Sequence, residues 1–131
     1  MIVLDTHAWV WWVADPAKLS ARARRAVDSA VEHGEVSISS ISAWEVAVLV
    51  ARGRLELTMD VADWVAASES LPFVRFVPVD NRIALRSVNL PAQFHADAAD
   101  RIIVATALEL DARLVTKDDR IRGSGVVTTV W

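Results

Sequence analysis

The stretch that decides the fold is the first one, MIVLD (residues 1–5). Four apolar residues in a row indicate a short strand buried on both faces, the kind found inside parallel sheets. Asp5 then stands at the carboxyl end of this strand. An ionised carboxylate at a buried position is costly unless something pairs with it. Asp5 therefore needs a partner from elsewhere in the chain.

Further strands and helices alternate along the rest of the sequence. Strands are expected at 35–39, 74–79, 113–116 and 126–130. Helical segments are expected at 6–15, 18–33, 40–53, 59–70, 80–88 and 98–111, with a helical turn at 117–121. This alternation predicts an α/β fold with a mostly parallel central sheet of about five strands and helices on both faces. We expect residues 1–131 to form a single domain.

Composition excludes several classes of protein. The chain has no cysteine, which rules out disulfides, thiolate metal sites and a cysteine nucleophile, and which fits a cytoplasmic protein. Neither a signal peptide nor an apolar run of the roughly 18 residues that span a membrane is present. The net charge of −3 argues against nucleic-acid binding by overall charge alone. However, 12 of the 14 basic residues are arginine, which suits bidentate phosphate contacts.

Carboxylates follow the ends of the other predicted strands. Glu45 interrupts the apolar stripe of the helix after the second strand, and Asp97 and Asp100 share one face at the start of the late helix. Asp118 follows the fourth strand. Each has an ordinary alternative role in helix capping: Glu45 in a capping box with Ser42, the aspartates as caps or favourable first-turn charges.

The combination is harder to explain by capping than any single residue. Because the carboxyl ends of parallel strands lie along one edge, Asp5, Glu45, Asp100 and Asp118 are expected in one cleft. Several carboxylates in one cleft cannot all stay ionised without a counter-charge. Mg²⁺ or Mn²⁺, which prefer oxygen ligands, would supply it.

Three segments together resemble the PIN-domain ribonucleases, and more closely the toxin half of VapBC toxin–antitoxin pairs. They are MIVLDTHAWVWW (1–12), SISAWEVAVLVARGRLEL (40–57) and HADAADRIIVATALELDARLVTKDDRI (95–121). The resemblance implies a PIN fold and Mg²⁺- or Mn²⁺-dependent RNA hydrolysis that leaves 5′-phosphate and 3′-hydroxyl ends. Related sequences often carry Asp-Pro-Phe-Asp where this chain has DAAD (97–100), so the loop geometry there is expected to differ.

The same resemblance assigns roles to the acidic residues. Asp5 and Asp100 are expected as direct metal ligands, with Glu45 orienting water or a second ion and Asp118 completing the catalytic site. Auxiliary roles are expected for Thr6, Asp97 and Thr116. The implied partners are an RNA substrate and a VapB-type antitoxin that covers the active site. The toxin would contact DNA only indirectly, through this antitoxin.

Other residues extend this interpretation. Candidates for RNA binding are Arg22, Arg25, Arg101 and Lys117. His7 is expected to pack near the sheet and His95 to lie in a surface loop. Trp9, Trp11 and Trp12 cannot all face one small core, so a homodimer or antitoxin surface is expected. We place Val46, Ala47 and Val50 on that surface, opposite the stripe that contains Trp44.

Three rival functions are considered. A phosphotransferase of the haloacid dehalogenase type needs a second acid at position 7, which is occupied by His7. A response-regulator receiver domain needs paired early acids that are absent. A non-catalytic PIN scaffold would not need the four carboxylates.

Overall fold

The structure, a computed structural model, describes residues 1–91, 94 and 97–131. The strands are β1 (Ile2–Leu4), β2 (Val36–Ser39), β3 (Val74–Val77), β4 (Arg113–Val115) and β5 (Thr129–Val130). The helices are α1 (Thr6–Ala14), α2 (Ala21–Glu32), α3 (Ser40–Ala51), α4 (Val61–Glu69), α5 (Asn81–Val88), α6 (Ala98–Glu109) and α7 (Asp119–Ser124), with a 3₁₀ helix η1 (Pro16–Lys18). His95 lies outside the described residues, so its expected place in a surface loop is not addressed.

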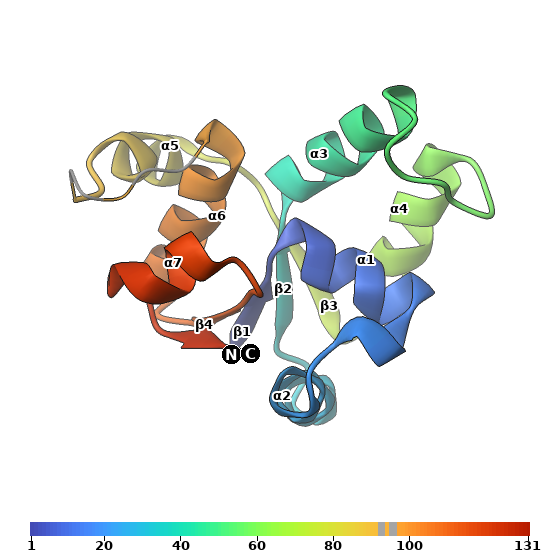
Figure 1. Cartoon of the computed structure of the whole chain (residues 1–131), viewed down its shortest axis with the longest axis horizontal. Coiled ribbons are helices and arrows are strands. Elements are labelled where there is room, and N and C mark those ends of the chain that lie inside the picture. The colour runs from blue at the N-terminus through green and yellow to red at the C-terminus, as the bar shows by residue number, and fades with distance from the viewer. Residues whose placement is uncertain (92–93, 95–96) are drawn as a thin grey trace.

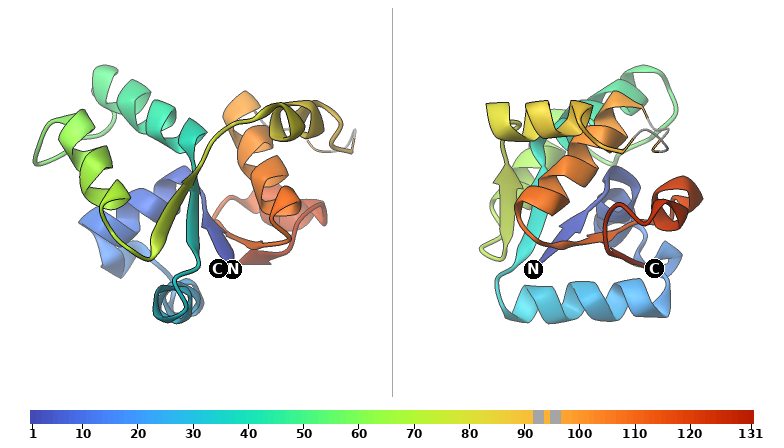
Figure 2. Two further views of the ribbon diagram at one scale, coloured as in Figure 1. Left: turned by 180° about the vertical axis from the view of Figure 1, so that it is seen from behind. Right: turned by 90° about the vertical axis from the view of Figure 1, so that its left-hand side faces the viewer.

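The expected fold is confirmed: the strands form one sheet in the order β3–β2–β1–β4–β5, and every neighbouring pair is parallel. Helices cover both faces (Figures 1 and 2). A hydrophobic core lies on each face of the sheet, and β1 contributes to both, because successive side chains of a strand point to opposite faces. Ile2 and Leu4 pack with α1 to α4, whereas Val3 packs with α6 and α7.

The strand order also locates the site. From β1 the chain builds the sheet outward through β2 and β3 on one side, and β4 and β5 lie on the other. The carboxyl ends of β1 and β4 therefore flank the point at which the direction of winding reverses, where open α/β sheets bind ligands. Leu4 pairs with Val115 in the parallel register, so Asp5 and Thr116 emerge side by side.

Two boundaries differ from the sequence-based expectation. The segment 18–33 is not one helix: η1 ends at Lys18, and α2 begins only after Ser20, whose hydroxyl accepts a hydrogen bond from the Ala23 N–H at 3.0 Å. The last strand is shorter than expected because only Leu114 and Val115 of β4 pair with it.

Part of α3 faces the opposite way from the prediction. Val46, expected on a partner surface, is fully buried in the core shared with α1 and α4. Trp44, expected in the inward stripe, is 59% exposed. Almost every position of α3 is apolar, so hydrophobic periodicity could not separate its faces. Among the described residues, no helix combines the length and apolar character that crossing a membrane requires.

Candidate active site

Asp5 joins β1 to α1 and belongs to both. Its N–H continues the sheet ladder by donating to the Val115 carbonyl at 3.1 Å. Its Oδ1 accepts a hydrogen bond from the Ala8 N–H at 2.8 Å, so Asp5 is also the N-cap of α1. Two elements thus hold the carboxylate at the edge of the sheet, half-buried.

Glu45 reaches the same edge from α3. The capping-box alternative is wrong, because the N-cap of α3 is Ser39, whose hydroxyl accepts from the Ile41 N–H at 3.2 Å. Glu45 Oε1 instead lies 2.5 Å from Thr6 Oγ1, which is also 2.9 Å from Ser42 Oγ. The buried Thr6 hydroxyl therefore orients Glu45 across the junction of α1 and α3, a function for Thr6 consistent with its expected auxiliary role.

Asp97 and Asp100 come from the start of α6. Asp97 is the N-cap, as the capping alternative held, and its Oδ1 accepts from the Asp100 N–H at 2.9 Å. Asp100 lies half-buried in the first turn of the helix. The segment Asp-Ala-Ala-Asp (97–100) thus forms a normal N-terminal turn of α6.

Asp118 follows β4 and caps α7, accepting from the Arg120 and Ile121 N–H groups at 2.9 and 3.1 Å. The buried Thr116 hydroxyl accepts from the Asp118 N–H at 3.1 Å and fixes the turn between strand and helix. Asp118 also pairs loosely with Arg120, at 3.8 Å. The Thr-x-Asp pattern is thus a turn that presents a carboxylate at the edge of the sheet.

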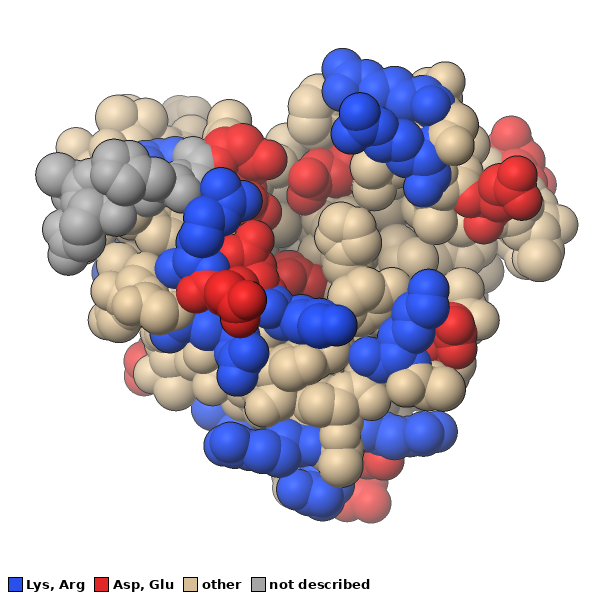
Figure 3. Space-filling view, viewed as in Figure 1, with Lys and Arg blue, Asp and Glu red and all other residues tan. Residues whose placement is uncertain are grey.

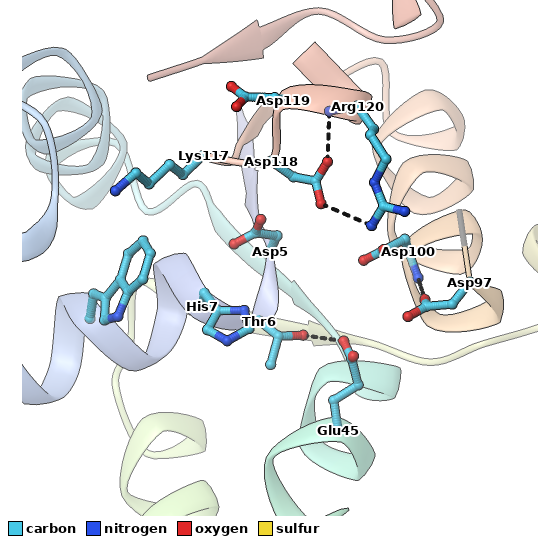
Figure 4. Close-up of a pocket in the computed structure, with 11 residues that line it drawn as sticks. Asp5, Thr6, His7, Glu45, Asp97, Asp100, Lys117, Asp118, Asp119 and Arg120 are labelled. Carbon is cyan, nitrogen blue, oxygen red and sulfur yellow. Dashed lines mark hydrogen bonds and ion pairs between the residues drawn. The ribbon is translucent and has the colours of Figure 1, made fainter. Parts of the chain in front are cut away.

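These side chains line one open cleft of about 620 Å³ (Figure 4). Its lining residues are Asp5, Thr6, His7, Trp11, Glu45, Asp97, Asp100, Lys117, Asp118, Asp119 and Arg120. Six carboxylates thus meet only two cationic side chains there. Figure 3 shows acidic atoms in a hollow between the two groups of helices, with Lys and Arg atoms around its rim.

The pKa values of three carboxyl groups in the cleft are raised. Burial and the neighbouring carboxylates of Asp97, Glu45, Asp118 and Asp5 raise the pKa of Asp100 to about 7. Burial also raises the pKa of Glu45, against the opposing effect of its hydrogen bond with Thr6. The pKa of Asp5 is raised mainly by burial, which outweighs its hydrogen bonds. The cleft thus holds more negative charge than its own cations neutralise.

A hard divalent cation fits this donor set. All the candidate ligand atoms are carboxylate oxygens, which Mg²⁺ and Mn²⁺ prefer, and their mutual repulsion is relieved by a positive ion. Among the residues described, however, no three acidic or histidine side chains converge closely enough to hold an ion as they stand. Binding of an ion would therefore require side chains of the cleft to move closer together.

The four predicted RNA-binding residues divide between different regions. Lys117 lines the cleft. Arg22 and Arg25 lie on α2 and are not among the residues that line the cleft. The Arg101 guanidinium donates to the carbonyls of Ser87, Val88 and Phe94.

Sequence reasoning missed several members of the lining. His7 is exposed and lines the cleft, so the expectation that it packs near the sheet is wrong. The first residues of α1 leave the strand at the open edge, which turns His7 toward solvent. Trp11, one helical turn later, together with Asp119 and Arg120, also lines the cleft. The i, i+4 spacing of His7 and Trp11 was the available signal.

Comparisons with known proteins agree with this geometry. Residues 2–124 match the family model of the PIN domain. The chain is 39% identical over 121 residues to Ribonuclease VapC22 of Mycobacterium tuberculosis (strain ATCC 25618 / H37Rv), covering 92% of this chain and 89% of that protein. Among solved structures, VapBC2 from Rickettsia felis bound to a promoter DNA fragment has a TM-score of 0.73 at 15% identity, covering 98% of this chain and 97% of that one. FitAcB from Neisseria gonorrhoeae has a TM-score of 0.70 at 24% identity, covering 98% and 96%. At these identities the two structures support the fold alone.

Proposed function

The chain belongs to the PIN-domain family, and on this premise we propose that it is a metal-dependent endoribonuclease, the toxin of a type II toxin–antitoxin pair. The observation that carries the proposal is the cleft itself. Carboxylates from four separate segments meet where the winding of the sheet reverses, with too few cations to neutralise them. The pKa values of Asp5, Glu45 and Asp100 are raised there. The 39% identity to a ribonuclease supports RNA as the substrate.

In the proposed mechanism Asp5 and Asp100 would hold a divalent cation, Mg²⁺ or Mn²⁺, Glu45 would orient water or a second ion, and Asp118 would complete the site. The chemistry that such a cation supplies is a lower pKa for water and neutralisation of charge on the phosphoryl oxygens. Thr6 keeps Glu45 aimed into the cleft, and Thr116 keeps Asp118 in its turn. Hydrolysis would leave 5′-phosphate and 3′-hydroxyl ends.

The proposed partner is an antitoxin of the VapB type, and the complex would bind DNA through that antitoxin. A second groove of about 290 Å³ shares Glu45 and Asp97 with the acidic cleft. Its wall carries the exposed Trp44 together with Val48 and Leu49. Acidic and apolar surfaces side by side suit a segment with apolar and basic residues. We also propose a homodimer, and activity in the cytoplasm.

The test is cleavage of a mixed RNA pool by the wild type in Mg²⁺, by the wild type in EDTA, and by Asp5→Asn in Mg²⁺. Asparagine caps a helix as well as aspartate does, so this variant should fold normally. We expect cleavage by the wild type in Mg²⁺ alone. Cleavage that survives both EDTA and the substitution would refute the proposed mechanism. Absence of both RNA cleavage and Mg²⁺ binding would favour the non-catalytic scaffold.

A further inference from the structure

One wall of the acidic cleft is aromatic. His7 and Trp11 both line it, with ring centroids 5.7 Å apart and ring planes inclined by 48°. Lys117 also lines the cleft, and its Nζ lies 5.9 Å from the centroid of the Trp11 ring. In Figure 4, Lys117 extends away from Asp100 and Asp97, whereas Arg120 lies on their side of the cleft.

The Trp11 side chain is held in place by packing against neighbouring apolar residues. Its ring packs against Trp131 at 5.7 Å between centroids, and it borders the core under α1. The side chain is half-buried rather than fully buried, so part of it faces the cleft while the rest is held in place. An aromatic ring that is held in place suits stacking against another flat ring, because little side-chain entropy remains to be lost.

The charges near Trp11 indicate which flat ring it would meet. Proteins that bind single-stranded nucleic acid combine cations that follow the backbone with aromatic side chains on which bases stack. Lys117 supplies the cation and disfavours a basic peptide side chain at the same place, since the two charges would repel. A duplex keeps its bases stacked inside, so only an unpaired base can reach this wall.

We infer that Trp11, with His7 and Lys117, forms a stacking subsite for an unpaired RNA base next to the phosphodiester bond that is cleaved. The inference rests on the proposed function and adds to it a binding subsite for one base of the substrate. Trp11 positions the base, and Lys117 contacts the adjoining phosphate or the face of the base.

Trp12 provides a matched control. It follows Trp11 in the same helix and is also half-buried, but its ring packs against Phe73, with centroids 6.1 Å apart, and it is absent from the cleft lining. If Trp11 only filled space, replacing either tryptophan would lower the melting temperature and leave RNA binding alike in the two variants. If Trp11 stacks on a base, only the Trp11 variant loses RNA affinity.

The experiment measures binding of a short, fluorescein-labelled single-stranded RNA by anisotropy in Mg²⁺. Every protein carries Asp5→Asn, so that cleavage does not interfere. We expect Trp11→Leu to weaken binding roughly tenfold to a hundredfold, the effect of losing one stacked base. Trp12→Leu should bind as the parent does. The parent should also bind the duplex form, and an oligomer of the same length without bases, as weakly as Trp11→Leu binds the intact strand.

A second variant covers the case in which Trp11→Leu does not fold. Lys117 is exposed, so Lys117→Gln leaves the core untouched. It should weaken binding and lower the slope of log affinity against log salt by about one, and Lys117→Arg should restore both.

The results separate this inference from the proposed function. Equal binding by the Trp11→Leu and Trp12→Leu variants, or equal affinity of the parent for RNA with and without bases, would overturn the stacking subsite, even if the wild type cleaves RNA. Trp11-dependent binding by a protein whose wild type does not hydrolyse RNA would uphold the subsite and overturn the proposed hydrolysis.

Discussion

At the scale of the residue, capping and ligand roles are not alternatives in this molecule. Asp5, Asp97 and Asp118 are all N-caps, and all three line the cleft. A capping hydrogen bond occupies one carboxylate oxygen and fixes the direction of the side chain, which leaves the other oxygen for a ligand. A helix that starts at the edge of the sheet therefore places its own capping acid in the site.

Asp100 lies in the first turn of α6 and its pKa of about 7 has a consequence for stability. In the unfolded chain its pKa is near the ordinary 3.8, so the folded state binds the extra proton between about pH 4 and 7. Without metal, the stability contributed by this proton is present at low pH and is lost as the pH rises through 7.

Asp100→Asn should remove this loss. In EDTA at pH 8 we expect the variant to melt a few degrees (roughly 2–6 °C) above the wild type, with a smaller difference at pH 5. The measurement is thermal denaturation followed by circular dichroism at both pH values. A variant that melts below the wild type by the same amount at both would show that Asp100 is not under electrostatic strain.

At the scale of the element, Arg101 joins α5 to α6. Its guanidinium donates at 3.0 and 2.9 Å to the carbonyls of Ser87, near the end of α5, and of Phe94, with a longer contact to Val88. These bonds satisfy carbonyls that the helix leaves open and favour a structural role over the RNA binding predicted from sequence.

Arg101→Ala should therefore lower the free energy of unfolding by about 2–3 kcal/mol, the range for hydrogen bonds from a charged group. Arg22→Ala, on the exposed face of α2, should change it by less than about 0.5 kcal/mol. Urea denaturation of both variants tests this. If the two variants are equally stable and only Arg101→Ala loses RNA affinity, Arg101 binds the substrate and has no structural role.

At the scale of the whole molecule, the helices and strands can be predicted from the sequence more accurately than the contacts between them. The alternation of strands and helices predicted the parallel sheet, and the expectation that Asp5, Glu45, Asp100 and Asp118 share one cleft agrees with its lining. The rotation of α3 could not be predicted, because an almost wholly apolar helix does not mark its buried face. Val46 was misplaced for this reason. The sequence also carries no signal that Arg22 and Arg25 lie outside the lining of the cleft.

The central claim is that carboxylates from separate segments act together on one divalent cation. The most direct measurement is a titration with Mn²⁺, followed by the electron paramagnetic resonance signal of the free ion. We expect the wild type to bind Mn²⁺, and Asp5→Asn and Asp100→Asn each to weaken binding by more than about tenfold, since even outer partners of a metal ligand matter that much. Asp63→Asn, at an exposed acid on α4, should bind as the wild type does. Binding that is absent from the wild type, or equal in all four proteins, would contradict the account.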